Sequence, residues 1–303
     1  MISTPSVETG AGAQIARLDF GGAVWEIRSM IREMRLELDL RTREFQSIRT
    51  GSANVVIKVE WAESLDVADQ VLFDVGIWRS SPAGDGLQFD FFTERLGSAP
   101  YKRAIFAREF NFGRVQLNRQ LLSNLDSYYP LEYPLDELVC IHRLGLGHGV
   151  ELHSCGLATG DGRGFLFVGH SGAGKSTLGK QWVKHRGATI LSDDRMVVTN
   201  DDRGFVIHGT PWHGEAGLAK NASARLQAIF LIEHGEANET VAMERNRSSA
   251  ELLSRSFVPW YRRQNLDFTL TFLQRLTAVV PVYVFRCLPD VSAVEYLERV
   301  HAI

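Results

Sequence analysis

Several features that would assign a chain to a common functional class are scarce in this sequence. Its 303 residues contain only three cysteines, Cys140, Cys155 and Cys287, without the spacing of metal ligands. Cysteines so placed are typical of reduced core residues, and we expect a cytoplasmic protein. The net charge of −3 provides no concentrated basic surface, so nucleic acid is not expected as a partner.

Long apolar runs are also missing. No stretch reaches the ~18 residues that a membrane span needs, and the most apolar C-terminal stretch is interrupted by Arg275 and Pro281. Residues 1–13 lack a basic segment followed by an apolar one, so they predict a disordered lead rather than a signal peptide. With 45% hydrophobic and 23% charged residues, the chain has the composition of a globular protein, and no membrane partner is expected.

The most informative stretch is FLFVGHSGAGKST, from Phe165 to Thr177. It matches the phosphate-loop pattern G-x-x-x-x-G-K-[ST]. The matching residues are Gly169, Gly174, Lys175 and Ser176. The apolar run Phe165–Val168 predicts a buried strand before the loop, and Leu178–His185 predicts a helix after it. Because the motif lies between a strand and a helix, a glycine-rich turn with a fortuitous lysine is the weaker interpretation.

We predict that this loop binds the phosphates of ATP together with Mg²⁺. Glycines let successive backbone amides converge on phosphate oxygens, and the following helix adds the positive end of its dipole. Lys175 is expected to reach the β- and γ-phosphates, and the Ser176 hydroxyl to ligate Mg²⁺. GTP or pyrophosphate stays open as the donor. The predicted nucleotide-binding residues are Gly169, His170, Ser171, Gly172, Ala173, Gly174, Lys175, Ser176 and Thr177.

An acidic pair, Asp193-Asp194, follows the short apolar segment Thr189–Ser192. We expect this segment to be a strand next to the loop, ending at the sheet edge where ligands of α/β proteins gather. Adjacent residues at a strand end point in different directions. We therefore predict that Asp193 orients the acceptor hydroxyl as the catalytic base and that Asp194 binds the metal or its water. The alternative is a turn-opening acidic pair on the surface.

Weaker candidates surround this constellation. His153 lies on the predicted strand Val150–Ala158 and could be catalytic or structural. Glu215 could complete a metal site with Ser176 and Asp194. Three further side chains could frame a substrate pocket or only pack the predicted loop from 209 to 217: His208, Trp212 and His213.

The N-terminal part predicts a different architecture from the rest. Residues 14–132 predict a mostly β domain with a linking helix over Gly113–Tyr129, and the boundary is expected near Pro130–Pro134. Its strands are expected to form an antiparallel sheet. They are Ile15–Phe20, Ala23–Arg28, Met34–Leu40, Val55–Trp61, Val71–Trp78 and Leu87–Phe92.

Residues 133–303 predict alternating helices and strands. After the acidic pair, Arg195–Thr199 and Gly204–His208 predict a hairpin. Besides the elements named above, the expected helices are Asp136–Leu146, Ser248–Ser256, Asn265–Ala278 and Val291–Val300, and the expected strands are Gln227–Glu233 and Val282–Cys287.

The order of these motifs resembles the catalytic domain of HPr kinase/phosphorylase. The motifs are LHS, a hairpin, G-x-S-G-x-G-K-S, a helix, a short strand with D-D, and another hairpin, within about Val150–Glu233. The following GTPWHGE segment is similar to HPr-kinase-like proteins of bacterial peptide-maturation gene clusters. The resemblance implies an α/β, P-loop-containing HPr-kinase-like catalytic domain behind an N-terminal β-rich domain. It also implies transfer of the γ-phosphate of ATP to a serine hydroxyl of a protein or peptide.

Carried over residue by residue, the resemblance places Lys175 and Ser176 at the nucleotide and metal positions. Asp193 matches the catalytic base, with Asp194 beside it, and His153 matches the histidine before the loop. Two positions depart from the family. Thr177 replaces a glutamate, and His208-Gly209 replaces an arginine-glycine signature, which argues against a phosphorylase activity. The N-terminal region does not match the family, so the acceptor need not be HPr.

Two other functions stay open at this point. A small-molecule kinase similar to shikimate or gluconate kinase would phosphorylate a small alcohol, but those enzymes have helices where a hairpin is predicted after Asp194. A nucleotide-dependent regulatory protein with little catalysis is the second alternative, and the missing arginine signature favours it. A homo-oligomer is possible in each case.

Overall fold

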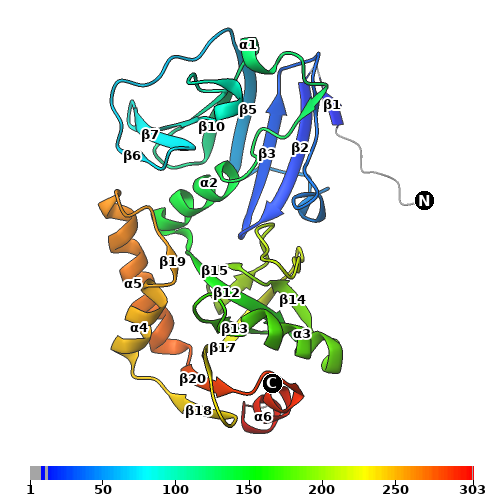
Figure 1. The fold of residues 1–303 in the computed structure, drawn as a ribbon, viewed down its shortest axis with the longest axis vertical. Helices are drawn as coiled ribbons and strands as arrows, with labels where there is room; N and C mark the ends of the chain where they lie inside the picture. Colours follow the sequence, from blue (N-terminus) through cyan, green and yellow to red (C-terminus); the bar gives the residue numbers. More distant parts are fainter. Residues whose placement is uncertain (1–7, 11–12, 302) are drawn as a thin grey trace, which may run out of the picture. The chain divides into compact units, whose positions relative to one another are not determined.

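The structure is a computed structural model that describes residues 8–10, 13–301 and 303. It is a mixed α/β chain with two large sheets, as expected for the class (Figure 1). Most of the lead expected at residues 1–13 lies outside the described residues. The described part differs from that expectation, because β1 (Glu8–Gly10) pairs with β2 (Ala13–Phe20) in an antiparallel ladder. None of the described helices is both long and apolar enough to cross a membrane.

The chain divides into two compact units. Unit 1 comprises Met1–Asp19 and Ala23–Val139, and unit 2 comprises Phe20–Gly22 and Cys140–Ile303. The division falls within helix α2 (Leu135–Arg143), a few residues beyond the prolines that mark the boundary in the sequence.

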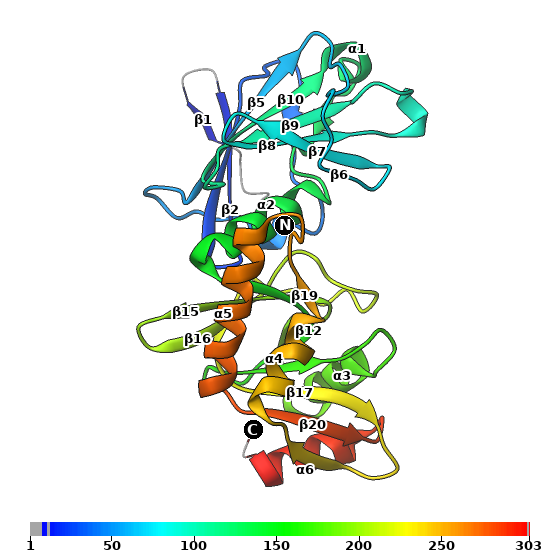
Figure 2. The same cartoon turned by 90° about the vertical axis from the view of Figure 1, so that its left-hand side faces the viewer.

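Unit 1 is built on a nine-stranded sheet with the order β1-β2-β3-β5-β10-β9-β8-β7-β6 (Figure 2). The strands after β2 are β3 (Ala23–Ser29), β5 (Val55–Ala62), β6 (Phe73–Asp74), β7 (Trp78–Ala83), β8 (Gly86–Phe91), β9 (Lys102–Phe106) and β10 (Phe112–Asn118). The expected antiparallel sheet is wrong in one respect, because β5 runs parallel to both β3 and β10. A small second sheet pairs β4 (Arg35–Leu36) with β11 (Ser127–Tyr128).

The helix predicted over Gly113–Tyr129 is wrong. Most of its first half is β10, and only α1 (Arg119–Leu122) is helical. Val115 and Leu117 are fully buried and lie two residues apart, on one face of a strand paired with β5. The strands expected at Met34–Leu40 and Val71–Trp78 are also largely wrong, since only β4, β6 and the first residue of β7 form there.

The sheet of unit 2 contains the strands on either side of the glycine-rich loop. Pairings of β12 (Val150–Ala158) with β13 and β15, of β15 with β16, and of β17 with β16 and β13 close a ring of five strands. The other strands are β13 (Arg163–Val168), β14 (Thr189–Ser192), β15 (Arg195–Asp201), β16 (Gly204–His208), β17 (Ser223–His234), β18 (Glu239–Ala242), β19 (Ser256–Phe257) and β20 (Val282–Cys287). The predicted strands and the hairpin β15–β16 are therefore confirmed, whereas β18 and β19 were not anticipated.

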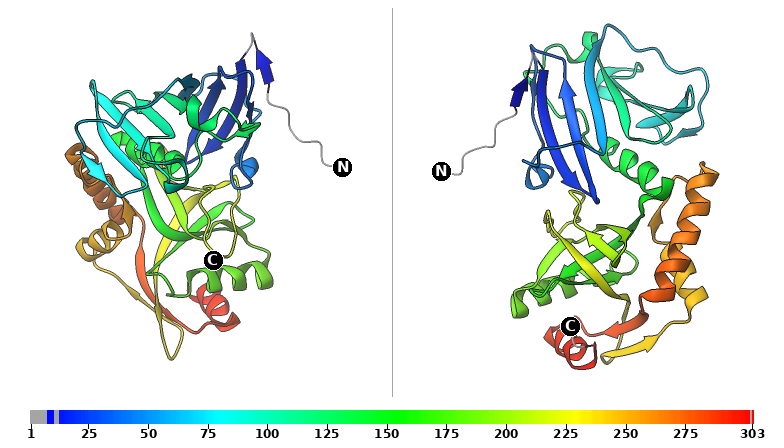
Figure 3. Two further views of the ribbon diagram at one scale, coloured as in Figure 1. Left: turned by 45° about the horizontal axis from the view of Figure 1, so that its top comes forward. Right: turned by 180° about the vertical axis from the view of Figure 1, so that it is seen from behind.

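Two pairs of helices cover the sheet of unit 2 on opposite sides (Figures 1 and 3). Leu166 and Val168 of β13 belong to a core with α4 (Arg245–Leu253) and α5 (Arg263–Val279). Phe165 and Phe167 belong to a second core, with α3 (Lys175–Arg186) and α6 (Val291–His301). Because β13 is buried on both faces, its residues Phe165–Val168 form an unbroken apolar run in the sequence. A π-helical turn (Leu144–His148) follows α2 and leads into β12.

Candidate functional site

The glycine-rich loop connects β13 to α3. The strand ends at Val168 and the helix begins at Lys175, so the predicted strand and helix both flank the motif. Gly172 and Gly174 have φ angles of 80° and 95°, in the left-handed region that favours glycine. The helix ends at Arg186 and is followed by Gly187, whose φ of 63° and N–H bond to the Val183 carbonyl (3.1 Å) form an αL cap.

Lys175 folds back onto its own loop. Its Nζ donates to the carbonyl oxygens of Gly169 (2.9 Å) and His170 (3.0 Å), and it lies 3.1 Å from the Nε2 of His153. Only 6% of the residue is exposed. Burial lowers the pKa of Lys175, and the nearby Asp194 carboxylate opposes that effect. The ammonium group therefore lies at the mouth of the loop with three acceptors that an incoming anion could replace.

His153 joins Lys175 to Asp194. The His153 Nδ1 lies 2.9 Å from an Asp194 carboxylate oxygen. Because an ammonium group has donors and no acceptor, the Nε2 facing Lys175 must accept. The proton of a neutral His153 therefore resides on Nδ1 and is donated to Asp194. The sequence marked His153 as either catalytic or structural, and the structure places it between two of the predicted site residues.

Asp194 is held in place by Arg195, which in turn contacts Phe257 and Glu151. Arg195 forms an ion pair with Asp194, and its guanidinium stacks 4.1 Å from the centre of the Phe257 ring. On its other side, Arg195 Nε lies 3.7 Å from the fully buried carboxylate of Glu151. Burial alone would raise the pKa of Asp194, but the hydrogen bond from His153 and the charge of Arg195 lower it below its usual range. Asp194 is thus ionised at neutral pH.

Asp193 points away from this group. Its two carboxylate oxygens accept hydrogen bonds from the backbone N–H groups of Gly214 (2.9 Å) and Ala216 (3.1 Å). The residue is 2% exposed, and its own N–H donates to the Leu218 carbonyl (3.2 Å). The acidic pair therefore diverges as expected. One carboxylate holds the loop at residues 209–217, and the other faces His153.

The strand that carries the acidic pair is not adjacent to the loop strand. β14 pairs with β12, and β12 lies between β14 and β13. Gly156 of β12 lies opposite both Leu166 of β13 and Ser192 of β14. β13 and β14 therefore run in the same direction and end at the same sheet edge, which brings the loop and the acidic pair together despite the extra strand.

The predicted metal ligands Ser176, Asp194 and Glu215 lie on three different segments of unit 2, and Asp194 is already paired with His153 and Arg195. Ser176 is partly buried in the first turn of α3, Thr177 beside it is exposed, and Glu215 is exposed in the loop that Asp193 holds. Within the described part of the chain, no three His, Cys, Asp or Glu side chains form a ready-made metal site. The Ser176 hydroxyl and the ionised Asp194 carboxylate beside the glycine-rich loop still fit Mg²⁺, which takes few protein ligands and completes its shell with phosphate oxygens and water.

The three side chains proposed to frame a substrate pocket instead pack the protein. His208 Nε2 lies 2.8 Å from the Thr199 hydroxyl, and burial lowers the pKa of His208 to about 4. Trp212 is 3% exposed, with its ring edge-on to Phe20 at 5.4 Å. His213 contacts the carbonyl of Gly214 (3.0 Å) within its own loop.

Two residues reach the loop from distant parts of the sequence and were not anticipated. Arg255 donates to the Nε2 of His170 (3.1 Å), its side chain is 10% exposed, and Glu251 holds its other nitrogen at 2.6 Å. His234, at the end of β17, lies 3.2 Å from the carbonyl of Gly172. Neither belongs to a motif, and only the pairing of β17 with β13 could have pointed to His234.

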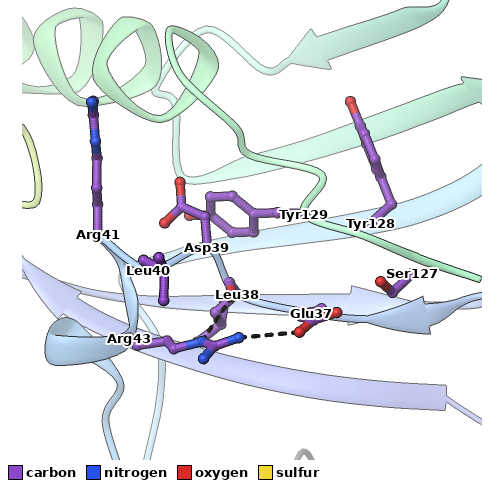
Figure 4. A pocket seen from close by; sticks show the side chains of 9 residues that line it. All are labelled: Glu37, Leu38, Asp39, Leu40, Arg41, Arg43, Ser127, Tyr128 and Tyr129. Atoms are coloured by element: carbon purple, nitrogen blue, oxygen red, sulfur yellow. Dashed lines mark hydrogen bonds and ion pairs between the residues drawn. The ribbon is translucent and has the colours of Figure 1, made fainter.

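A separate cavity of about 530 Å³ lies in unit 1 (Figure 4). It is formed by the segments 37–43 and 127–129. None of the predicted site residues lines it, and the charged groups of Glu37 and Arg43 pair with each other at 3.1 Å.

Comparison with known proteins gives a partial likeness among solved structures. No protein-family model and no curated protein matches the chain. Among solved structures it is similar to the HPr(Ser) kinase/phosphatase from Coxiella burnetii, with 15% identity and a TM-score of 0.29, over 50% of this chain and 95% of that chain. A likeness at this identity and TM-score does not indicate an activity.

Proposed function

We propose that the chain is a phosphotransferase that moves the γ-phosphate of ATP to a hydroxyl group, with Mg²⁺ as cofactor and a serine of a protein or peptide as acceptor. The observation that carries the proposal is the chain of contacts Lys175–His153–Asp194 at the mouth of a glycine-rich loop. Together these groups offer a cation for phosphate and a proton acceptor beside it, which is what phosphoryl transfer requires.

The loop supplies the binding of the donor. Backbone amides of the glycine-rich loop and of the first turn of α3 would bind the phosphates, with Lys175 turned from its loop carbonyls to the β- and γ-oxygens. Ser176 would hold Mg²⁺ together with phosphate oxygens, with Glu215 as a further oxygen ligand. When bound, the metal would neutralise charge on the phosphates of the donor.

In this proposal the two aspartates take different roles from those predicted from the sequence. Both oxygens of Asp193 are held by backbone amides, so we assign Asp193 as a positioning residue for the loop 209–217. Asp194 orients His153 and favours the tautomer with a free Nε2. Once the Lys175 ammonium turns toward phosphate, that nitrogen can accept the proton of the acceptor hydroxyl.

The acceptor oxygen bonds to the γ-phosphorus, the bond between the γ-phosphorus and the bridging oxygen breaks, and ADP leaves with the electron pair. The hydroxyl proton goes to His153 Nε2, and the positive imidazole is stabilised by the adjacent Asp194 carboxylate.

The alternatives are less well supported. Shikimate-type and gluconate-type kinases continue with helices where this chain has the hairpin β15–β16. A purely regulatory nucleotide-binding protein has no need of a histidine held between a carboxylate and the loop lysine.

The test is a phosphoryl-transfer assay with the full chain. The protein is incubated with γ-labelled ATP, Mg²⁺ and a library of serine-containing peptides, and phosphopeptides are identified by mass spectrometry. Wild type should produce phosphoserine, and Lys175→Ala should not. Lys184→Ala, on the exposed face of the same helix, is the matched control. If neither a labelled product nor ATP binding is seen with wild type, the proposal is wrong.

A further inference from the structure

A second cavity lies in unit 2, beside the glycine-rich loop. It has a volume of about 580 Å³ and is lined by His234, Gly235, Glu236, Ala237, Glu239 and Arg286. This volume falls within the range of about 300–1,000 Å³ that is usual for small-molecule sites.

Its position follows from the strand order. β17 runs parallel to β13, with Leu231 opposite Val168, so both strands end at the same sheet edge. The cavity begins at His234, the last residue of β17, whose Nε2 lies 3.2 Å from the carbonyl of Gly172 in the loop. One wall of the cavity is thus in direct contact with the loop.

The cavity lies on the side of the loop strand opposite the reacting groups. His153 is on β12, which pairs with one edge of β13, whereas β17 pairs with the other edge. A triphosphate whose terminal phosphate lies beside His153 and Lys175 would therefore extend its other end toward β17.

The walls of the cavity are preorganised. Arg286 forms ion pairs with Glu233 (3.2 Å) and Glu239 (2.8 Å), so its guanidinium lies between two carboxylates. Gly235 packs closely against it, because a Cβ at this position would lie 2.9 Å from both the Arg286 Cβ and the carbonyl oxygen of Ala237. The turn is therefore built around the arginine, and a larger residue at position 235 would displace it.

We propose that this cavity binds the nucleoside of the donor nucleotide, with the base against the planar groups of His234 and Arg286 and the ribose hydroxyls on Glu236. Guanidinium and imidazole planes stack on bases, and a carboxylate is the usual partner of ribose hydroxyls. This inference rests on the proposed function, since it assigns the other end of the same ligand.

The experiment compares two ligands that share phosphates and differ in the nucleoside. Calorimetry measures the dissociation constants of MgATP and of magnesium tripolyphosphate for the full chain and for His234→Ala and Glu236→Ala. We expect each substitution to weaken MgATP binding by about 10-fold and to leave tripolyphosphate binding unchanged. His185→Ala and Glu295→Ala, both on exposed helix faces, are the matched controls, and thermal unfolding verifies that each variant is folded.

The outcomes separate this inference from the proposed function. If wild type binds both ligands equally, or if neither cavity substitution weakens MgATP, the nucleoside does not lie in this cavity, while phosphate binding at the loop stands. If His234→Ala weakens tripolyphosphate as much as MgATP, His234 supports the loop rather than the nucleoside, and the inference also fails. If wild type binds neither ligand, the proposed function itself fails.

Discussion

The Nε2 of His153 lies 3.1 Å from the Nζ of Lys175, so the candidate proton acceptor and the candidate phosphate-binding cation contact each other. While this contact persists, the lone pair of Nε2 is engaged by the ammonium. Turning the lysine toward a bound phosphate would release the histidine. Donor binding and activation of the base would thus be coupled through a single side chain.

The first prediction concerns the lysine. Lys175→Ala removes the charge that neutralises phosphate, and we expect nucleotide affinity to fall by about 10- to 100-fold, as for a lost charge-assisted hydrogen bond. Calorimetry with MgATP gives the measurement, and Lys184→Ala should bind as wild type does. Unchanged affinity in Lys175→Ala would falsify the assignment of the loop.

The second prediction separates the orienting carboxylate from binding. Asp194→Asn should lower the transfer rate by about 10²-fold with little change in MgATP affinity, because the asparagine no longer stabilises a protonated His153. Steady-state kinetics on an identified peptide resolves kcat from KM. Asp267→Asn, an exposed aspartate of α5, is the control. A variant that transfers phosphate at the wild-type rate would remove His153 and Asp194 from the mechanism.

The third prediction concerns Asp193, where we expect a loss of stability before a loss of chemistry. Asp193→Asn places an N–H donor against the backbone N–H groups of Gly214 and Ala216, and should cost about 1–3 kcal/mol in the free energy of unfolding. Urea unfolding measures this cost, with Asp202→Asn in an exposed turn as the control. Wild-type stability together with abolished transfer would instead return the role of base to Asp193.

The fourth prediction is a pH dependence of stability caused by His208. Its pKa is lowered by burial from 6.5 to about 4, so between these values the unfolded state binds more protons than the folded state. The contribution of His208 to the free energy of unfolding should therefore be fully present above pH 6.5 and be lost as the pH falls toward 4. The loss attributable to His208 should be about 3 kcal/mol.

Urea unfolding at a series of pH values tests this effect. In His208→Gln, which keeps a polar side chain near Thr199, the decline between pH 6.5 and 4 should be much smaller. An identical decline in wild type and variant would show that other groups cause the acid sensitivity.

The fifth prediction concerns Arg255, which supports the loop through His170. Arg255→Lys keeps the charge but loses the fork that contacts Glu251 and His170 together, and we expect the transfer rate to fall by about 10-fold. Arg263→Lys, on a side chain that is 93% exposed, is the control. If kcat and KM both stay at wild-type values, Arg255 has only a structural role.

The local parts of this architecture could be predicted from the sequence. The strand before the loop, α3 with its αL glycine and the hairpin β15–β16 depend on patterns within a few residues, and they were confirmed. The helix predicted over Gly113–Tyr129 was wrong because the apolar residues at 115 and 117 suit a strand as well as a helix. The strand β5 that pairs with them in parallel lies far away in sequence.

The candidate site could likewise be predicted from the sequence only in part. The divergence of the two aspartates was expected, but the direction of each carboxylate depends on the path of the loop 209–217. Arg255 and His234 reach the glycine-rich loop only through tertiary structure. A single sequence contains no local signal for either contact.

The side chains of β13 are buried alternately in two cores, and this alternation determines the position of the loop that follows the strand. Successive side chains of this strand enter two different cores, Leu166 and Val168 on one side and Phe165 and Phe167 on the other. A slip of one residue would force phenylalanines into the space of smaller side chains and leave voids opposite. The two cores therefore fix the register of β13 and, with it, the position of Gly169 at the start of the loop. The loop can change its conformation on binding while the end of the strand stays in place.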